Sequence, residues 1–278
     1  MDLSLNNVSY AYPLRDGKVK QALTGVSLTV RKGECLGIIG PEGAGKTTLL
    51  LVMDMLLVPD EGSVLADGVN VWEKKETAVR ERRRIGMGFQ FPEQQFVAET
   101  VEDELLFPTP PRDSLPSISP AEALSAVGLD PKRFLKRYPF YLSMGEARRV
   151  ALASLLVRNP EVLLLDEPTV GLDGEGRAGF LRFIKDQHKQ GTTLVVVSHD
   201  LDCLCEFATN IVVLREGCIE GVGSVASVMR DASLLNLAGY DPPETITLLD
   251  HLAVKGIVAP DVFMRPDEIA RLKADGSS

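Results

Sequence analysis

The sequence predicts an α/β fold in which a small antiparallel sheet precedes a mostly parallel core sheet that carries an inserted helical subdomain. Between residues 162 and 214, short apolar runs alternate with helical stretches, which is typical of parallel strands covered on both faces. Residues 3–12 and 23–30 instead alternate around a turn, which predicts the N-terminal antiparallel β-subdomain. Residues 100–158 have a mostly helical pattern, broken by the proline-rich stretch 108–120.

The other elements follow from the same patterns along the chain. We expect one domain over residues 1–230, with its helical subdomain at about 92–158, and a C-terminal helical extension over 231–278. Apolar runs bounded by polar turns predict strands, and longer periodic stretches predict helices. The expected strands are 34–39, 62–65, 85–89, 162–165, 193–197 and 211–214, and the expected helices are 49–57, 176–190 and 201–208.

A glycine-rich loop lies between the first of these strands and the first of these helices. It satisfies the pattern G-x-x-x-x-G-K-[ST] in the strand–loop–helix setting that a phosphate-binding loop needs. Its glycines let backbone N–H groups face an anion, and Lys46 is expected to reach the β- and γ-phosphates while Thr47 binds Mg²⁺. The alternative is a tight turn that carries a lysine by chance. The loop reads Gly40-Pro41-Glu42-Gly43-Ala44-Gly45-Lys46-Thr47-Thr48.

Polar side chains that suit a phosphate site follow three other apolar strands. Asp166 and Glu167 end the run at 162–165; we expect Asp166 to hold Mg²⁺ and Glu167 to orient or deprotonate an attacking water. Gln90 is expected to bind Mg²⁺ or the water, and His199 to contact the γ-phosphate. Each alone is also compatible with an ordinary polar turn. Together they predict a P-loop nucleoside triphosphatase.

The motifs in this order resemble those of the ATP-binding subunits of ABC transporters. Leu142-Ser143-Met144-Gly145-Glu146 is similar to the family signature Leu-Ser-Gly-Gly-Gln, and Gly171-Leu172-Asp173 to its D-loop. Gln90 corresponds to the Q-loop, and Ser198-His199-Asp200 to the switch histidine. The resemblance covers residues 1 to about 225 with six motifs. It implies an ATPase that uses ATP and Mg²⁺.

The same resemblance implies that two chains pack head to tail, as a homodimer or as a heterodimer with a paralogue. Each ATP would lie between the phosphate loop of one chain and Ser143, Gly145 and Glu146 of the other, with Asp173 of the D-loop nearby. Read alone, Ser143 and Glu146 also form a plausible capping box at a helix start. Met144 departs from the family, because it replaces the first glycine of the signature.

An aromatic ring near the N-terminus stacks on adenine in this family. In Val8-Ser9-Tyr10-Ala11-Tyr12-Pro13 the position of Tyr12 matches that ring. Strand alternation leaves Tyr10 as the alternative, with Tyr12 then in the sheet.

A second resemblance narrows the family to the energy-coupling-factor and cobalt-type importers. The run from Phe89 to Glu104, with Pro92-Glu93-Gln94-Gln95-Phe96, and the tail from Ala238 to Pro243 are similar to theirs. This implies uptake of a vitamin or a cobalt or nickel ion. It also implies two membrane partners, a transmembrane coupling subunit and a substrate-binding subunit. The implied docking residues include Gln94, Gln95, Phe96 and Val97, for which ordinary packing of the subdomain is an equal alternative.

Composition limits the other function classes. The net charge of −9, from 30 basic and 39 acidic residues, disfavours non-specific nucleic-acid binding. We interpret the basic cluster at 80–84 as a solvated helix end. We expect no signal peptide, no membrane span and reduced cysteines, so membrane contact would come only through partners at the cytoplasmic face. A soluble ABC ATPase for nucleic acid and a non-catalytic nucleotide-binding module remain alternatives, but Glu167 argues against the second.

Overall fold

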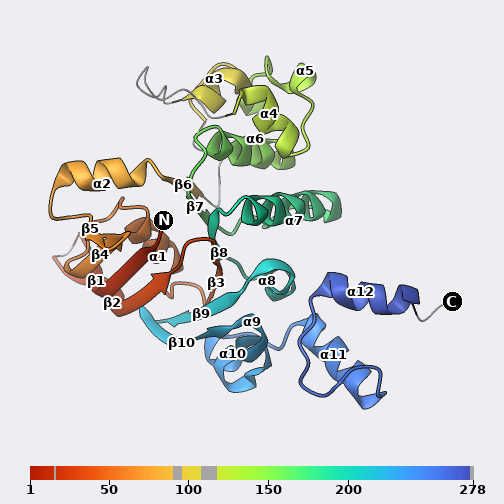
Figure 1. Cartoon of the computed structure of the whole chain (residues 1–278). Helices are drawn as coiled ribbons and strands as arrows, with labels where there is room; N and C mark the ends of the chain where they lie inside the picture. Colours follow the sequence, from red (N-terminus) through yellow and green to blue (C-terminus); the bar gives the residue numbers. More distant parts are fainter. Residues whose placement is uncertain (16, 90–95, 108–117, 276–278) are drawn as a thin grey trace.

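The chain forms two sheets with covering helices (Figure 1). The computed structural model describes residues 1–15, 17–89, 96–107 and 118–275. The N-terminal sheet lies beside the core sheet, helices α3–α6 gather above it, and α11 and α12 lie at the far C-terminal end (Figure 1).

The N-terminal sheet is antiparallel throughout, which confirms the predicted β-subdomain. Its strand order is β2-β1-β4-β5. The pairing of β1 with β2 shifts register at three points, one of them between Tyr10 and Ala11. The strands are β1 (Leu3–Pro13), β2 (Val19–Val30), β4 (Glu61–Ala66) and β5 (Val69–Asn70).

The core sheet has the order β10-β9-β3-β8-β7-β6, and every pairing except β10 with β9 is parallel. This confirms the mostly parallel sheet that the sequence predicts. The edge strand β10, which contains Gly221 and Gly223, is not among the expected strands given above. The strands are β3 (Cys35–Ile39), β6 (Ile85–Gly88), β7 (Val162–Asp166), β8 (Thr193–Val197), β9 (Asn210–Arg215) and β10 (Cys218–Ser224).

Alternate residues of the core strands enter two separate hydrophobic clusters. In β7, Val162 and Leu164 pack with the N-terminal sheet, whereas Leu163 and Leu165 pack with the helices of the opposite face. Because successive side chains of a strand point to opposite faces, a strand buried on both sides reads as one apolar run. The strand ends are thereby fixed, and the polar residues that follow them meet at one edge.

Helix α1 carries the end of the phosphate loop and is shorter than predicted. It ends at Met53 instead of residue 57, because Met55 adopts the left-handed conformation with φ of 57°. The helices that precede the inserted subdomain in the chain are α1 (Lys46–Met53) and α2 (Lys75–Arg82). Those that follow it are α7 (Gly174–Lys189) and α8 (Leu201–Phe207).

Short helices form the insertion and the C-terminal extension. The insertion contains α3 (Val101–Leu106), α4 (Pro120–Ala126), α5 (Pro131–Phe134), a 3₁₀ turn (Pro139–Tyr141) and α6 (Met144–Leu156). The C-terminal part contains α9 (Val225–Arg230), α10 (Ala232–Ala238), α11 (Glu244–Val254) and α12 (Pro266–Asp275). Within the described ranges, none of these helices combines the length and the apolar character that crossing a membrane requires.

The basic cluster at 80–84 closes helix α2, as interpreted from the sequence. Arg82 pairs with the buried Asp54, and Arg84 pairs with Glu81, Asp67 and Glu161. Through these ion pairs, Arg82 and Arg84 connect the end of α2 to the core. The four cysteines form no disulfide.

Candidate nucleotide-binding site

The loop between β3 and α1 borders a cleft at the carboxyl edge of the core sheet. At two positions of this loop only glycine fits, because the backbone of another segment lies too close for a side chain. A Cβ on Gly40 would lie 2.0 Å from the carbonyl oxygen of Leu214, and one on Gly45 would lie 2.4 Å from that of Ala22. Both also have positive φ, 152° and 101°. Larger residues would therefore push the loop out of this path.

Helix α1 begins at Gly45 without a side-chain cap. The amides of its first turn lack partners within the helix, so the loop presents hydrogen-bond donors and a partial positive charge to the cleft. Lys46 Nζ donates to the carbonyl oxygens of Gly40 (2.6 Å) and Pro41 (2.9 Å). Burial lowers the pKa of Lys46, while the carboxylates of Glu167, Asp166 and Glu42 oppose that shift. A phosphate would bind here by charge and by backbone amides together.

Thr47 and Asp166 place two hard oxygen ligands at the same point of the cleft. The Thr47 hydroxyl donates to Asp166 Oδ2 at 2.6 Å. Burial raises the pKa of Asp166, although the Thr47 hydrogen bond and the Lys46 charge lower it. A hydroxyl and a carboxylate beside a phosphate loop suit Mg²⁺, which is bound by few protein oxygens together with substrate phosphates. These residues therefore fit the ion that the sequence implies.

Glu167 is buried and held in an unusual backbone conformation at the end of β7. Its φ is 49°, and its amide donates to the carbonyl oxygen of Val197 at 3.0 Å. One carboxylate oxygen, Oε2, accepts from the His199 amide at 3.2 Å. The other, Oε1, has no hydrogen-bond partner, although His199 Nε2 lies 3.1 Å away. Burial raises the pKa of Glu167 to about 7.

His199 stands half-exposed between Glu167 and a residue of the C-terminal extension. Its Nδ1 lies 2.5 Å from the hydroxyl of Tyr240, which also lies 3.2 Å from the carbonyl oxygen of Gly40. Burial lowers the pKa of His199, and the nearby Lys46 charge adds to that shift. Tyr240 did not stand out as a site residue in the sequence. It is 200 residues from Gly40 in the chain, and no local pattern could reveal the contact.

The two candidate aromatic residues of β1 have different positions. Tyr12 lines the cleft, and its hydroxyl lies 3.3 Å from Thr48 Oγ1. Tyr10 packs against the hydrophobic cluster of the N-terminal sheet, with the two rings edge to face at 5.0 Å. Lys20, Gln21 and Ala22 of β2 also line the cleft, although no motif in the sequence marks them as site residues.

Other predicted site residues lie away from the cleft of the same chain. Ser143 and Glu146 form the capping box at the start of α6, and Gly145 is in its first turn with open space around it. Asp173 is exposed and caps α7 through the amide of Gly176 at 2.7 Å. Gln90 lies outside the described residues.

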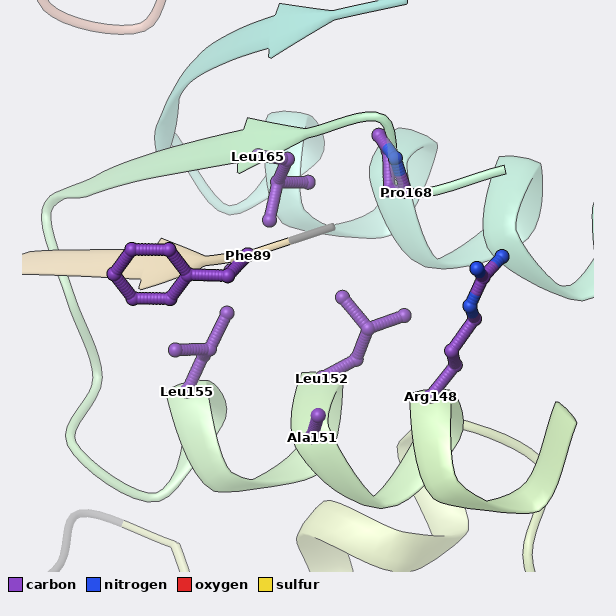
Figure 2. Close-up of a pocket in the computed structure, with 8 residues that line it drawn as sticks. Phe89, Arg148, Ala151, Leu152, Leu155, Leu165 and Pro168 are labelled. Carbon is purple, nitrogen blue, oxygen red and sulfur yellow. The ribbon is translucent and has the colours of Figure 1, made fainter. Parts of the chain in front are cut away.

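An apolar cavity separates α6 from the strand that ends in the two carboxylates (Figure 2). Leu152 and Leu155 of α6 face Leu165 of β7 and the ring of Phe89 across it (Figure 2). Arg148 lies at the end of the cavity near Pro168, which directly follows Glu167 in the sequence. Helix α6, which Ser143 caps, and strand β7, which Glu167 follows, thus pack together with a cavity between them that side chains do not completely fill.

The sequence of this chain is similar to those of a known protein family. The model of the family described as "ABC transporter" matches residues 23–170. The energy-coupling factor transporter ATP-binding protein EcfA2 of Symbiobacterium thermophilum is 37% identical over 279 residues, covering 98% of this chain and 96% of the relative.

Solved structures agree in fold. CbiO1 from Clostridium perfringens, part of the ABC transporter complex CbiONQ, superposes with a TM-score of 0.70 at 27% identity, covering 89% of this chain and 98% of that one. The ATP-binding cassette MJ0796, in a dimeric post-hydrolysis state with ADP and Pi, gives 0.69 at 29% identity over 80% of this chain and 98% of its own. The phosphate loop, the paired carboxylates and these likenesses agree, and this chain belongs to the ABC transporter family, as an ATP-hydrolysing, ATP-binding subunit of an energy-coupling factor transporter.

Proposed function

We propose that this chain drives an importer, taking up a vitamin or a transition-metal ion such as cobalt or nickel. Support comes from the relatives named as energy-coupling factor subunits and from the likeness to a cassette of a CbiONQ complex. The chain itself would not contact the transported substrate. Its part is to convert ATP hydrolysis into movement of membrane partners from the cytoplasmic face.

In the proposed mechanism, the phosphate loop and Lys46 hold the phosphates of ATP. The side chain of Tyr12 lies where it can stack on adenine, a contact that tolerates different bases. Thr47 and Asp166, with Gln90, would hold Mg²⁺, which neutralises charge that develops on the phosphates. Glu167 accepts a proton from the attacking water, and His199 contacts the γ-phosphate. The water oxygen bonds to the γ-phosphorus as the bond from the β,γ-bridging oxygen to that phosphorus breaks, giving ADP and phosphate.

One observation carries this mechanism: a buried carboxylate oxygen of Glu167 without a hydrogen-bond partner, at the edge of the cleft. Buried polar atoms are nearly always paired, so an unpaired one at a cleft indicates a missing ligand. A water between Glu167 and the γ-phosphate would satisfy it. A pKa of about 7 also suits a general base that works near neutral pH.

The active unit in this proposal contains two ATP-binding chains. Ser143, Gly145 and Glu146 lie outside the cleft of their own chain, yet Ser143 and Gly145 match the family signature and Glu146 stands where its Gln does. A second chain packed head to tail would bring its signature against this chain's phosphates, with Asp173 at the same interface. The second chain is either another copy or a paralogue. In the latter case the two sites differ, and Met144 marks one of them.

The membrane partners would be a transmembrane coupling subunit and a separate substrate-binding subunit. Phe96 is buried in the helical core while Val97 is 61% exposed, so of these two described docking candidates only Val97 is free for an external contact. Gln94 and Gln95 lie outside the described residues. Of the proposed docking residues, Val97 is therefore the one whose contact with a membrane partner can be tested.

Affinity purification of the tagged chain from detergent-solubilised native membranes tests the assembly. We expect to recover one coupling subunit, one small membrane-bound binding protein and a second ATP-binding chain, identified by mass spectrometry. The binding protein then names the substrate class by direct binding assays with vitamins and with Co²⁺ or Ni²⁺. Recovery without any membrane protein would overturn the importer proposal.

A further inference from the structure

The C-terminal extension makes hydrogen bonds to α8, the helix that follows His199. The carboxylate of Asp202, in the first turn of α8, accepts from the amides of Glu244 (3.1 Å) and Thr245 (2.8 Å) and from the Thr245 hydroxyl (2.6 Å). These are the first two residues of α11, which has no side-chain cap of its own. An acidic side chain at the start of a helix satisfies its free amides and complements its dipole.

The other end of α8 is held by a second part of the extension. The Arg265 guanidinium donates to the carbonyl oxygens of Cys205 (3.2 Å) and Ala208 (3.1 Å). The last carbonyls of a helix have no partner within it, and a cation there is favourable. The extension therefore fixes both ends of α8, and with them the loop that presents His199.

Tyr240 precedes both of these contacts in the chain, between α10 and α11, and its hydroxyl reaches the nucleotide site. Helix α10 ends at Gly239 with φ of 81°, and the Tyr240 amide donates to the carbonyl oxygen of Leu235 at 3.0 Å. This helix end fixes the direction of the Tyr240 side chain. Its hydroxyl lies 2.5 Å from His199 Nδ1 and 3.2 Å from the carbonyl oxygen of Gly40. Gly40 accepts from Lys46 through the same carbonyl.

We propose that Tyr240 is a positioning residue that donates its hydroxyl proton to His199 Nδ1, so that the opposite ring nitrogen, Nε2, carries a proton toward Glu167 and the phosphate cleft. A phenol has one proton to donate. The Gly40 carbonyl oxygen, to which the hydroxyl can also donate at 3.2 Å, already accepts from Lys46 at 2.6 Å, and Nδ1 is the nearer acceptor at 2.5 Å. The tautomer of a neutral imidazole is set by the partner of its other nitrogen. The proposal rests on the proposed role of His199 at the γ-phosphate.

The consequence is that the extension belongs to the hydrolytic site as well as to the assembly. A neutral His199 with its proton on Nδ1 would direct a lone pair from Nε2 at both Glu167 and a phosphate, and neither contact would be favourable. With the proton on Nε2, the ring has one N–H to donate; it goes to the γ-phosphate when ATP is bound, and Glu167 Oε1 is left for the attacking water. Tyr240 thus selects the one neutral form that suits the site.

Histidine nitrogen spectra test this assignment in the full-length, nucleotide-free chain, because the sequence has three histidines. Two of them serve as internal references. His188 Nε2 lies 3.0 Å from the carbonyl oxygen of Gly33, and His251 Nδ1 lies 2.9 Å from that of Thr247. A carbonyl only accepts, so His188 carries its proton on Nε2 and His251 on Nδ1.

With ¹⁵N-labelled histidine at alkaline pH, where imidazoles are neutral, we expect His199 to give the same tautomer pattern as His188. In Tyr240→Phe the His199 signals should shift toward a mixture of tautomers, with those of His188 and His251 unchanged. His199 signals of the His251 type, or signals that do not change in Tyr240→Phe, would overturn the proposal. The latter outcome is informative because the phenyl ring preserves packing.

Kinetics give an independent readout. Tyr240→Phe should lower kcat for ATP hydrolysis roughly tenfold, less than the loss of a whole transition-state donor, with KM within about twofold of the wild type. Tyr141→Phe, on a side chain that is 81% exposed, is the matched control and should leave both constants unchanged. A Tyr240→Phe enzyme with unchanged kcat would refute the positioning role. If His199→Ala hydrolyses ATP normally while the spectra behave as expected, the proposed role of His199 fails and the contact itself stands.

Discussion

The two helices that carry nucleotide motifs begin in opposite ways. Helix α1 starts at Gly45 with no side-chain cap, in a loop that backbone contacts hold in place. Helix α6 starts at Ser143 with a complete capping box, in which Glu146 Oε2 accepts from the Ser143 amide at 2.8 Å. The first helix leaves its amides for a ligand, whereas the second satisfies its own.

This difference shows where the nucleotide site is preorganised. The α1 half is assembled by the core sheet of one chain and is ready for phosphate. The α6 half has a helix start that is already capped, and among the described residues it contributes none of the lining of its own chain's cleft. Substitutions at equivalent residue types in the two halves should therefore have unequal effects.

The largest contrast is expected between two glutamates. Glu167→Gln should bind ATP and hydrolyse it at least ~100-fold more slowly, the usual scale for loss of a general base. Glu146→Gln should stay within about threefold of the wild type, because Gln also completes a capping box and is the commoner residue of the signature. Steady-state hydrolysis and nucleotide binding measure both. Near-normal turnover of Glu167→Gln would remove Glu167 from the mechanism.

The next contrast concerns two glycines. Gly45→Ala should lower the free energy of unfolding by about 2–3 kcal/mol, since a Cβ there would meet a backbone oxygen at a positive φ. Gly145→Ala should change it by no more than about 0.5 kcal/mol, because the added Cβ meets open space at the start of a helix. Equilibrium urea unfolding compares them. Equal losses would show that the phosphate loop is not sterically fixed.

The two glutamates should also respond to pH with opposite signs. Burial raises the pKa of Glu167 from 4.5 to about 7, whereas the hydrogen bond from the Ser143 amide lowers that of Glu146. The folded chain then holds a proton on Glu167 that the unfolded chain releases between pH 4.5 and 7, so stability falls as pH rises through that window.

Glu167→Gln should consequently be more stable than the wild type at pH above about 7, by roughly 3 kcal/mol, and no more stable below pH 4.5. The stabilising contribution of Glu146 is present above its unfolded pKa and is lost as pH falls, so Glu146→Gln should destabilise at neutral pH. Thermal or urea unfolding across pH checks both signs. A destabilised Glu167→Gln at high pH would contradict the burial argument.

The smallest effect is expected at the cap of α6. Ser143→Ala should cost about 1 kcal/mol in unfolding free energy without nucleotide, the usual value for loss of an N-cap. Ser119→Ala at the capping box of α4 is a matched control with an equal stability loss. Of the two, only Ser143→Ala should also slow hydrolysis. Equal activity of the two variants would limit Ser143 to its structural role.

Much of the fold and the α1 half of the site could be predicted because their signals are local. The strands at 162–166 and 193–197 are continuous apolar runs, and the loop motif fixes both spacing and residue type. The early end of α1 could not be predicted, since it depends on the backbone of Met55. Tyr240 was missed for a different reason: its role depends on how a distant helix packs. The domain boundaries at 230 and 92–158 and the catalytic roles stay predictions.

The contact between Tyr240 and Gly40 also determines when the site can be completed during synthesis of the chain. The two residues are separated by 200 positions. At a synthesis rate of about 5–20 residues per second, the phosphate loop is made roughly 10–40 s before the tyrosine that contacts it. Strand β3 likewise waits for its neighbours β8 and β9. A nascent chain therefore has its phosphate-binding sequence without its final arrangement until Tyr240 has been made.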